Sequence, residues 1–178
     1  MNCYSGKDLA RAYRTVRENT IKIAEEIPEA KLDFAAAPGV RTVRQMLTHI
    51  ALSDAFAGVH KEKRTNFDGI NFPALVGQMQ AEEAKPRTKA ELIALLKERG
   101  EETATWLESL TDDFLAEPFT QPRGTPATKS RFEMIMSLKE HEMHHRGQLM
   151  LIERMLGITP HLTRAMQERF AAPAQARS

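Results

Sequence analysis

The first candidates for chemistry are histidines, because three of the six in this 178-residue chain fall within one short segment, residues 141–145. His141 and His145 are four positions apart, so on an α-helix both side chains lie on the same face, one turn apart. Two imidazoles in this arrangement can bind one metal ion. Because the same spacing also occurs in helices that bind nothing, the pattern needs support from its surroundings.

The helical face that carries this pair is largely apolar, which makes two histidines there unusual. Besides Gln148, it carries Met134, Leu138, Ile152 and Leu156. An imidazole in an apolar environment costs free energy unless both of its ring nitrogens find partners. A metal ion satisfies one nitrogen of each ring, and a carbonyl, a carboxylate or water commonly takes the other.

A third candidate ligand, His49, lies on the inner stripe of an earlier amphipathic segment. If the two helices adjoin, His49, His141 and His145 form a site of three nitrogens. Neutral imidazoles suit zinc, nickel, copper or iron(II) rather than magnesium or calcium. Three protein ligands also leave a coordination position open for water or substrate, as expected of a catalytic ion. The alternative is that all three are hydrogen-bonded core residues.

The remaining histidines are expected outside this site. His144 points ~100° around the helix from His145, and His60 lies ~16 Å along its helix from His49. His161 follows a proline and is expected to be exposed. Near the pair, Gln148 could hydrogen-bond a ligand or the outer nitrogen of a histidine, and simple packing is the alternative.

Two further residues of this helix have specific interpretations. Gly147 costs roughly 1 kcal/mol relative to alanine inside a helix, which is tolerable if another helix or a ligand approaches closely there. Arg146 is predicted to form a surface ion pair with Glu142, one turn earlier.

Four long helical segments position these residues. Three of them begin with a capping box, in which a Thr or Ser side chain and a Gln or Glu three positions later satisfy free backbone N–H groups. The first helix ends before Pro28, which cannot donate a backbone hydrogen bond. We therefore predict helices over residues 5–27, 42–63, 88–110 and 130–156.

The connections between these helices are long. We expect a short helical turn within residues 72–81, a loop over residues 111–129 that holds three prolines, and a short final helix over residues 162–170. The pattern predicts an all-α fold, a four-helix bundle with long loops, in a single domain that spans residues 1–178.

Composition excludes several classes of protein. Hydrophobic residues make up 42% of the chain and charged residues 28%, which is typical of a globular rather than a disordered protein. The net charge is +1, with basic and acidic residues interspersed, so we expect no nucleic-acid partner. No apolar run approaches ~18 residues, and no signal peptide is visible, so we expect no membrane span and a cytoplasmic location. The single cysteine, Cys3, is expected to be a terminal thiol without a disulfide, not a nucleophile.

Two segments carry a resemblance to a known family. Residues 43–51 read V-R-Q-M-L-T-H-I-A and residues 141–149 read H-E-M-H-H-R-G-Q-L, and both resemble the DinB-like superfamily of damage-inducible and YfiT-type proteins. The resemblance implies an up-down-down-up bundle, a homodimer, and a metal held by His49, His141 and His145. It also implies nickel or zinc as the ion, with iron or manganese as alternatives.

The same resemblance suggests a reaction. Characterised relatives include transferases and an isomerase that use low-molecular-weight thiols, so the first hypothesis is a metal-dependent S-transferase acting on a small molecule. A metal-dependent hydrolase is the second hypothesis, although the nearby acids Glu142 and Asp54 point away from the site and offer no obvious general base. The third is a stress-associated protein in which the metal only stabilises the bundle. The sequence assigns no catalytic residue beyond the ligands.

Overall fold

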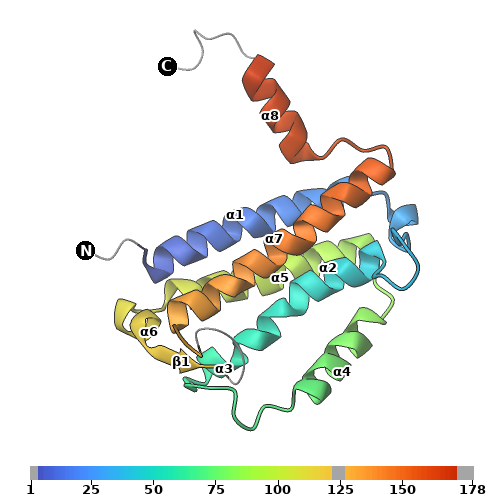
Figure 1. Cartoon of the computed structure of the whole chain (residues 1–178). Helices are drawn as coiled ribbons and strands as arrows, with labels where there is room; N and C mark the ends of the chain where they lie inside the picture. The colour runs from blue at the N-terminus through green and yellow to red at the C-terminus, as the bar shows by residue number, and fades with distance from the viewer. Residues whose placement is uncertain (1–3, 122–126, 172–178) are drawn as a thin grey trace.

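The computed structural model describes residues 4–121 and 127–171, and these form an all-α four-helix bundle. Figure 1 shows that α1 and α7 run in one direction and that α2 and α5 run in the other, which is the up-down-down-up order. The four helices are α1 (Gly6–Glu26), α2 (Val43–Leu52), α5 (Lys89–Glu108) and α7 (Arg131–Met155). Because α2 and α5 are consecutive yet parallel, the chain must return between them, and it does so through α4.

Shorter elements fill the connections. The described ranges contain the 3-10 turns η1 (Glu29–Lys31) and η2 (Ser53–Ala57), the helices α3 (Gly58–Lys61), α4 (Phe72–Glu83), α6 (Asp112–Ala116) and α8 (His161–Ala171), and the strands β1 (Pro118–Thr120) and β2 (Thr128–Ser130). Cys3 lies outside the described residues.

The prediction of a plain loop over residues 111–129 is wrong in part. The segment holds α6 and an antiparallel pair in which Pro118 lies opposite Ser130 and Thr120 opposite Thr128. The ring of Phe119 explains why this short strand is held in place. It is fully buried and packs 4.9 Å from the ring of Phe67 and 4.6 Å from that of His60, measured between centroids.

The three predicted capping boxes are all present, and they fix where α2, α5 and α7 begin. A fourth, between Ser5 and Asp8, starts α1. This box was not predicted, because the usual capping-box pattern has Glu or Gln three positions after the N-cap. Here the shorter side chain of Asp8 makes the same contact. Gly157 follows the end of α7 with φ of 79°, a left-handed conformation that glycine adopts readily at the C-terminal end of a helix.

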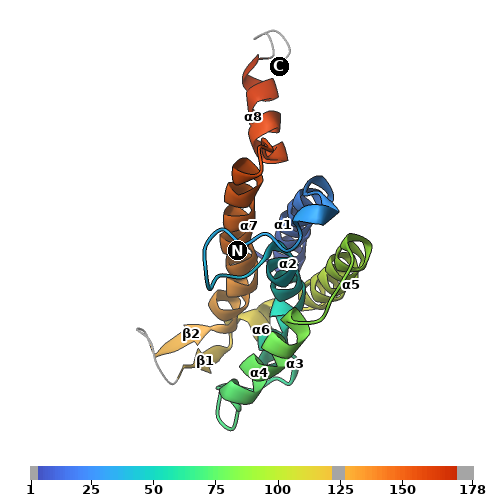
Figure 2. The same cartoon turned by 90° about the vertical axis from the view of Figure 1, so that its right-hand side faces the viewer.

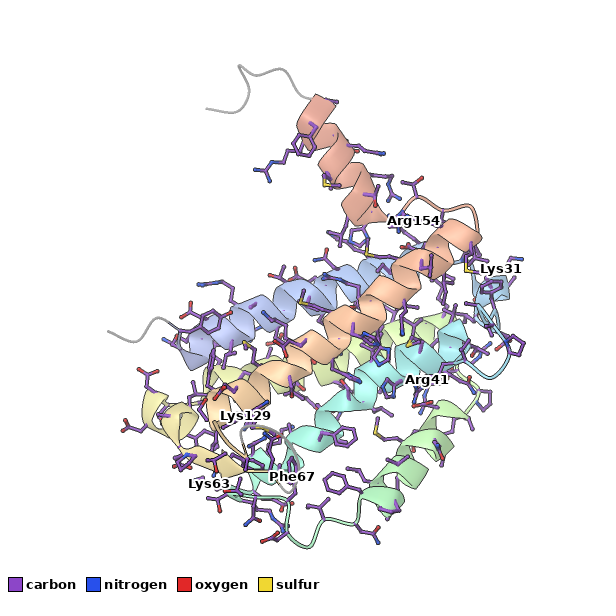
Figure 3. All side chains as sticks on the ribbon, in the orientation of Figure 1. Lys31, Arg41, Lys63, Phe67, Lys129 and Arg154 are labelled. Atoms are coloured by element: carbon purple, nitrogen blue, oxygen red, sulfur yellow. The ribbon has the colours of Figure 1, made fainter. Side chains whose placement is uncertain are left out.

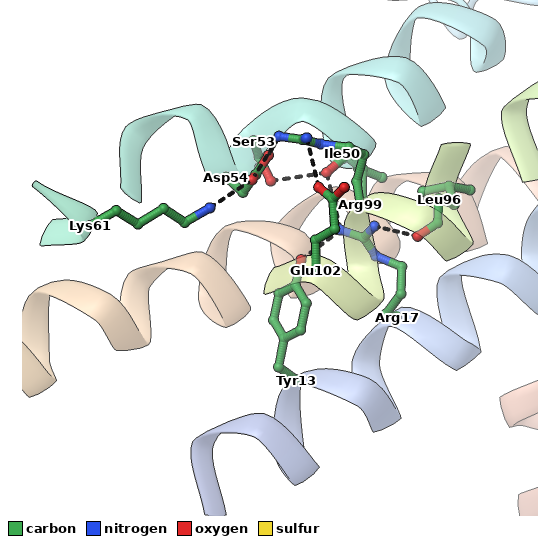
Figure 4. A network of polar contacts seen from close by, with 9 residues as sticks. All are labelled: Tyr13, Arg17, Ile50, Ser53, Asp54, Lys61, Leu96, Arg99 and Glu102. Carbon is green, nitrogen blue, oxygen red and sulfur yellow. Dashed lines mark hydrogen bonds and ion pairs between the residues drawn. The ribbon is translucent and has the colours of Figure 1, made fainter. Parts of the chain in front are cut away.

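The second helix is shorter than predicted, because α2 ends at Leu52 and continues as η2 and α3. The carbonyl of Ile50 is the reason. It accepts from the hydroxyl of Ser53 at 2.9 Å and from the guanidinium of Arg17 at 3.3 Å, so the α-helical partner of this carbonyl is displaced. Figure 4 shows this network, in which Asp54 also pairs with Arg99.

A buried ion pair lies between two apolar clusters of the core. Arg17 of α1 donates to both carboxylate oxygens of Glu142 on α7 at 2.9 to 3.1 Å, and both side chains are almost fully buried. Arg17 also donates to the carbonyl of Leu96 on α5 at 2.8 Å. The predicted surface pair between Glu142 and Arg146 is therefore wrong, because Glu142 points into the bundle toward a partner 125 positions earlier in the chain.

Two helices stand off the bundle, as Figures 1 and 2 show. α4 lies beside α2, and α8 projects from the end of α7, where it touches the end of α1. Within the described ranges, no helix is both long and apolar enough to cross a membrane.

Candidate metal centre

The structure brings the three predicted histidines together. His49 lies in α2, and His141 and His145 lie one turn apart in α7. The Nε2 atom of His141 is 3.1 Å from Nε2 of His49 and 3.1 Å from Nε2 of His145. One ring nitrogen from each residue falls within 4.8 Å of the other two.

These spacings suit one shared ion. Imidazole nitrogens bind zinc at ~2.0–2.1 Å, so two of them on one ion are ~2.9–3.4 Å apart in octahedral or tetrahedral geometry. The two 3.1 Å separations fall within that interval. In the part of the chain that the structure describes, the cluster holds three histidines and no fourth protein ligand.

The outer nitrogens fix the orientation of two of the rings. Nδ1 of His49 donates to Oε1 of Glu83 at 2.8 Å, and Nδ1 of His145 donates to Oε1 of Gln148 at 2.8 Å. Because these oxygens can only accept, both Nδ1 atoms carry the proton and both Nε2 atoms present lone pairs.

Those lone pairs converge on His141, which can supply one proton at most. One pair of nitrogens therefore faces lone pair to lone pair unless a cation lies between them. Nδ1 of His141 is buried and has no hydrogen-bond partner among the described residues. This donor set, three inward-facing imidazole nitrogens short of protons, fits a divalent transition metal.

The protonation state agrees with this interpretation. Burial, more than any charge, lowers the pKa of His49 and of His145. Burial and the neighbouring imidazoles His145 and His49 lower the pKa of His141 to about 4. All three rings are therefore neutral at neutral pH, which is the form that binds metals.

Glu83 and Arg41 also belong to the candidate site, although no sequence pattern predicted either residue. Glu83 is buried at the end of α4, and its Oε2 accepts from Nε of Arg41 at 2.8 Å. Little in the sequence points to Glu83, because the predicted helical turn stopped at residue 81 and α4 has no strong apolar face. A carboxylate that holds the outer nitrogen of a histidine is a common support for metal ligands.

The neighbouring residues follow the predictions only in part. Gln148 does bind the outer nitrogen of a histidine, and its amide nitrogen lies 3.3 Å from Nε2 of the exposed His144. No other helix of the described chain approaches Gly147, because a Cβ there would meet nothing within 4 Å, and the approach of a ligand at this glycine stays a prediction. His161 is half-buried rather than exposed, since its ring contacts Asn19 at 3.0 Å.

His60 lies outside the histidine cluster and has different neighbours. It is buried against Phe119 and lies 3.4 Å from the guanidinium of Arg131. Burial and that neighbouring charge lower the pKa of His60 to about 4. His60 is a neutral core residue, and it lies outside the histidine cluster, as its distance from His49 along the chain predicts.

The histidines do not line the cavity of about 540 Å³ that lies where the N-termini of α2 and α5 meet the end of α4. Charged side chains of both signs line much of it, and Glu83 forms part of its wall. The chemistry of the histidine cluster carries the site assignment, because no comparable set of metal ligands lines this cavity.

Comparisons with known proteins agree with the fold. A family model of the DinB superfamily matches residues 12–149. A DinB-like protein of Bacillus subtilis, YjoA, is similar at 26% identity, with a TM-score of 0.61 over 85% of this chain and 93% of that one. YfiT of Bacillus subtilis, described as a probable metal-dependent hydrolase with an unusual four-helix bundle topology, is 18% identical, with a TM-score of 0.66 over 86% of this chain and 89% of that one. No curated protein matches the chain.

A third similar structure concerns nucleic acids. The colibactin self-resistance protein ClbS, solved in complex with a dsDNA, is 16% identical, with a TM-score of 0.61 over 86% of this chain and 98% of that one. At this identity the likeness extends to the fold alone. The fold therefore does not exclude a nucleic-acid partner, and the expectation that this chain has none stays a prediction.

Proposed function

This chain belongs to the DinB superfamily, and from that premise we propose that it is a metal-dependent enzyme whose ion is held by His49, His141 and His145. The observation that carries the proposal is the convergence of three neutral imidazoles whose inward nitrogens cannot satisfy one another. Nickel or zinc is the proposed ion, with iron or manganese as alternatives.

The open coordination position gives the proposed site its reactivity. When bound, a divalent ion acidifies a thiol or a water molecule that occupies this position. Our first candidate reaction is S-transfer, in which the sulfur of a low-molecular-weight thiol attacks an electrophilic carbon of a small molecule. A C–S bond forms, the leaving group departs with the electrons of its own bond to that carbon, and the thiol proton passes to solvent. Glu83 and Gln148 serve this reaction by keeping His49 and His145 in the tautomer that binds metal.

The surroundings favour a thiol over water as the nucleophile. Hydrolysis usually needs a general base within hydrogen-bond reach of the attacking water. Glu83 already accepts from His49 with one oxygen and from Arg41 with the other. Glu142 is buried in its pair with Arg17. A thiol that has lost its proton on binding needs no such base during the attack.

Metal-dependent hydrolysis is the second candidate, and the description of YfiT is what favours it. In that reaction Glu83 would have to exchange one of its two present contacts for the attacking water. A metal that only stabilises the bundle is the third candidate, and a closed fourth coordination position would favour it.

Metal analysis and cobalt substitution test the proposal together. We expect about one nickel, zinc or iron per chain in untagged wild-type protein by mass spectrometry, and loss of this metal in His145→Ala and His49→Ala. His161→Gln, a histidine substitution outside the cluster, is the matched control and should retain the metal.

The cobalt-substituted protein then separates the candidate reactions. A small thiol should shift its visible absorption by entering the open position. If the protein carries no metal, or if His49→Ala retains it, the three-histidine site is wrong. If cobalt binds and thiols leave its spectrum unchanged, the S-transfer candidate fails and hydrolysis takes its place.

We also propose that the protein is a homodimer, and that one face of α7 forms the contact. Met143, Leu151 and Met155 recur on that face at helical spacing, and all three are exposed. Light scattering should give twice the mass of the chain for wild type. It should give the same mass for the control Ala94→Glu, a substitution on the exposed face of α5. Leu151→Glu should give one chain mass, and a dimer unaffected by this change would contradict the assignment.

A further inference from the structure

Arg41 presents an unused guanidinium edge beside the histidine cluster. It immediately precedes Thr42, the N-cap of α2, and Figure 3 places it between the start of α2 and the end of α4. Its Nε donates to Oε2 of Glu83 at 2.8 Å, while Oε1 of the same carboxylate accepts from His49. One carboxylate thus fixes both the guanidinium and a proposed metal ligand.

The position of Arg41 next to the cluster follows from this shared carboxylate. Nε of Arg41 and Nδ1 of His49 each lie 2.8 Å from an oxygen of Glu83, so a single carboxylate separates the guanidinium from the ring of His49.

The terminal nitrogens of Arg41 are available. Among the described residues, its only polar contact runs from Nε to Glu83, and its side chain is 37% exposed. A guanidinium has five N–H donors, so the planar edge formed by the two terminal nitrogens is free for a ligand.

Other arginines near the bundle interior use that edge on the protein. Arg17 places its terminal nitrogens on Glu142, Tyr13 and backbone carbonyls. Arg44 places one on Asp33 and the other on the carbonyl of Arg87. Arg41 differs from these arginines, because its Nε is hydrogen-bonded and its two terminal nitrogens have no partner among the described residues.

We propose that Arg41 binds an oxyanion group of the substrate, a carboxylate or a phosphate, while another atom of the same molecule occupies the open position at His49, His141 and His145. The inference rests on the proposed metal site and narrows its substrate class to small anionic molecules. A fork of two N–H donors matches two oxygens of such a group. Two fixed attachment points orient a ligand far better than one.

Arg41→Gln is the sharpest variant for the test. The Nε2 atom of Gln follows the same number of side-chain carbons as Nε of Arg, so it can keep the hydrogen bond to Glu83. It lacks the terminal nitrogens and the charge. Arg14→Gln removes a guanidinium from the exposed face of α1, where it pairs with Glu101 and Glu108, and serves as the control.

The experiment is calorimetric titration of the zinc-loaded protein with succinate, with inorganic phosphate and with neutral succinamide, after the zinc content of each sample has been measured. We expect wild type and Arg14→Gln to bind at least one anion and Arg41→Gln to bind it roughly ten- to hundredfold more weakly, because a bond to a charged group is lost. None of the three proteins should bind succinamide measurably. Succinate and phosphate distinguish a carboxylate from a phosphate as the preferred group.

Each remaining outcome has a defined meaning. Equal anion affinity in Arg41→Gln and wild type at full zinc content overturns the inference and leaves the metal site standing. Zinc-loaded wild type that binds neither anion overturns it as well. Wild type without zinc refutes the proposed function instead. If Arg41→Gln is the only sample that loses zinc, Arg41→Lys takes its place in the experiment. An anion affinity of Arg41→Lys equal to that of wild type would overturn the bidentate contact.

Discussion

At the scale of single residues, one chain of polar contacts runs through the candidate site. It passes from Arg41 to Glu83, on to His49 and His141, and through His145 to Gln148. Glu83 and Gln148 set the tautomers of His49 and His145, so these outer residues decide which nitrogens face His141. The candidate site is therefore larger than its three histidines.

Replacing Glu83 by alanine tests this dependence. We expect Glu83→Ala to weaken zinc affinity about ten- to hundredfold, because Nδ1 of His49 loses the acceptor that fixes its tautomer and orientation. Competition with a chromogenic chelator measures the affinity. Glu98→Ala, on the exposed face of α5, should bind zinc like wild type, and an undiminished affinity in Glu83→Ala would show that the carboxylate has no part in the site.

The sequence could predict the three histidines and the contact of Gln148 to one of them, but not the support that Glu83 and Arg41 give to His49. His141 and His145 can be recognised by their helical spacing on an apolar face. His49 can be recognised because it lies on the apolar face of another helix. Glu83 and Arg41 carry no comparable signal, because exposed Glu and Arg residues are common in the chain. Their role depends on how α4 packs beside α2, which is a tertiary contact that no local pattern encodes.

At the scale of elements, the Arg17–Glu142 pair joins the four long helices at the level of the site. Arg17 belongs to α1, Glu142 to α7, and the carbonyls of Leu96 and Ile50 belong to α5 and to α2. Glu142 directly follows His141, and Ile50 directly follows His49. The pair therefore fixes the rotation of α2 and α7, the two helices that carry the three histidines.

Two helical glycines give opposite predictions because of this pair. A Cβ at Gly100 would lie 2.7 Å from Cγ of Arg17, whose guanidinium is held by Glu142 and cannot move aside. We expect Gly100→Ala to destabilise the protein by about 1–3 kcal/mol through overpacking. Gly147 has open space, so Gly147→Ala should stabilise it by about 0.5–1 kcal/mol.

Urea denaturation of both variants measures these changes. Because both glycines lie inside long helices, intrinsic helix propensity alone predicts the same gain for each. A gain in Gly100→Ala would mean that α1 and α5 can separate at little cost, and the buried pair would then not be rigid.

Helix starts could be predicted from sequence, and interruptions could not. A capping box is local, since both partners lie within four residues, and each predicted box is present. The end of α2 at Leu52 depends on Arg17, which reaches the carbonyl of Ile50 from 33 positions away. The β1–β2 pair likewise depends on where Phe119 is buried. Such contacts exist only in the assembled fold.

At the scale of the whole molecule, the junction of α7 and α8 contains a buried carboxylate that no other side chain of the described residues pairs with. Glu153 is fully buried near the end of α7, and neither of its side-chain oxygens has a hydrogen-bond partner among the described residues. Arg164 of α8 donates to both carboxylate oxygens of nearby Glu26. Burial and the charge of Glu26 raise the pKa of Glu153 to about 7.

This raised pKa predicts how stability changes with pH. In the unfolded chain Glu153 loses its proton near pH 4.5, whereas in the folded protein it keeps the proton until about pH 7. The folded state therefore binds more protons between these values, so the contribution of Glu153 to stability is complete below pH 4.5 and is lost as pH rises through 7. The difference is at most about 3 kcal/mol.

Glu153→Gln removes this titration and should leave the packing intact. We expect the variant to match wild type in free energy of unfolding near pH 4.5 and to exceed it by about 1–3 kcal/mol at pH 8, because the amide needs no proton to stay neutral. Urea denaturation across this range, with a chelator present so that metal binding does not contribute, measures the difference. Glu98→Gln, an exposed substitution, should show a difference from wild type that does not vary with pH. A constant difference for Glu153→Gln as well would mean that water or movement of α8 already solvates Glu153, and α8 would then be only loosely docked on the bundle.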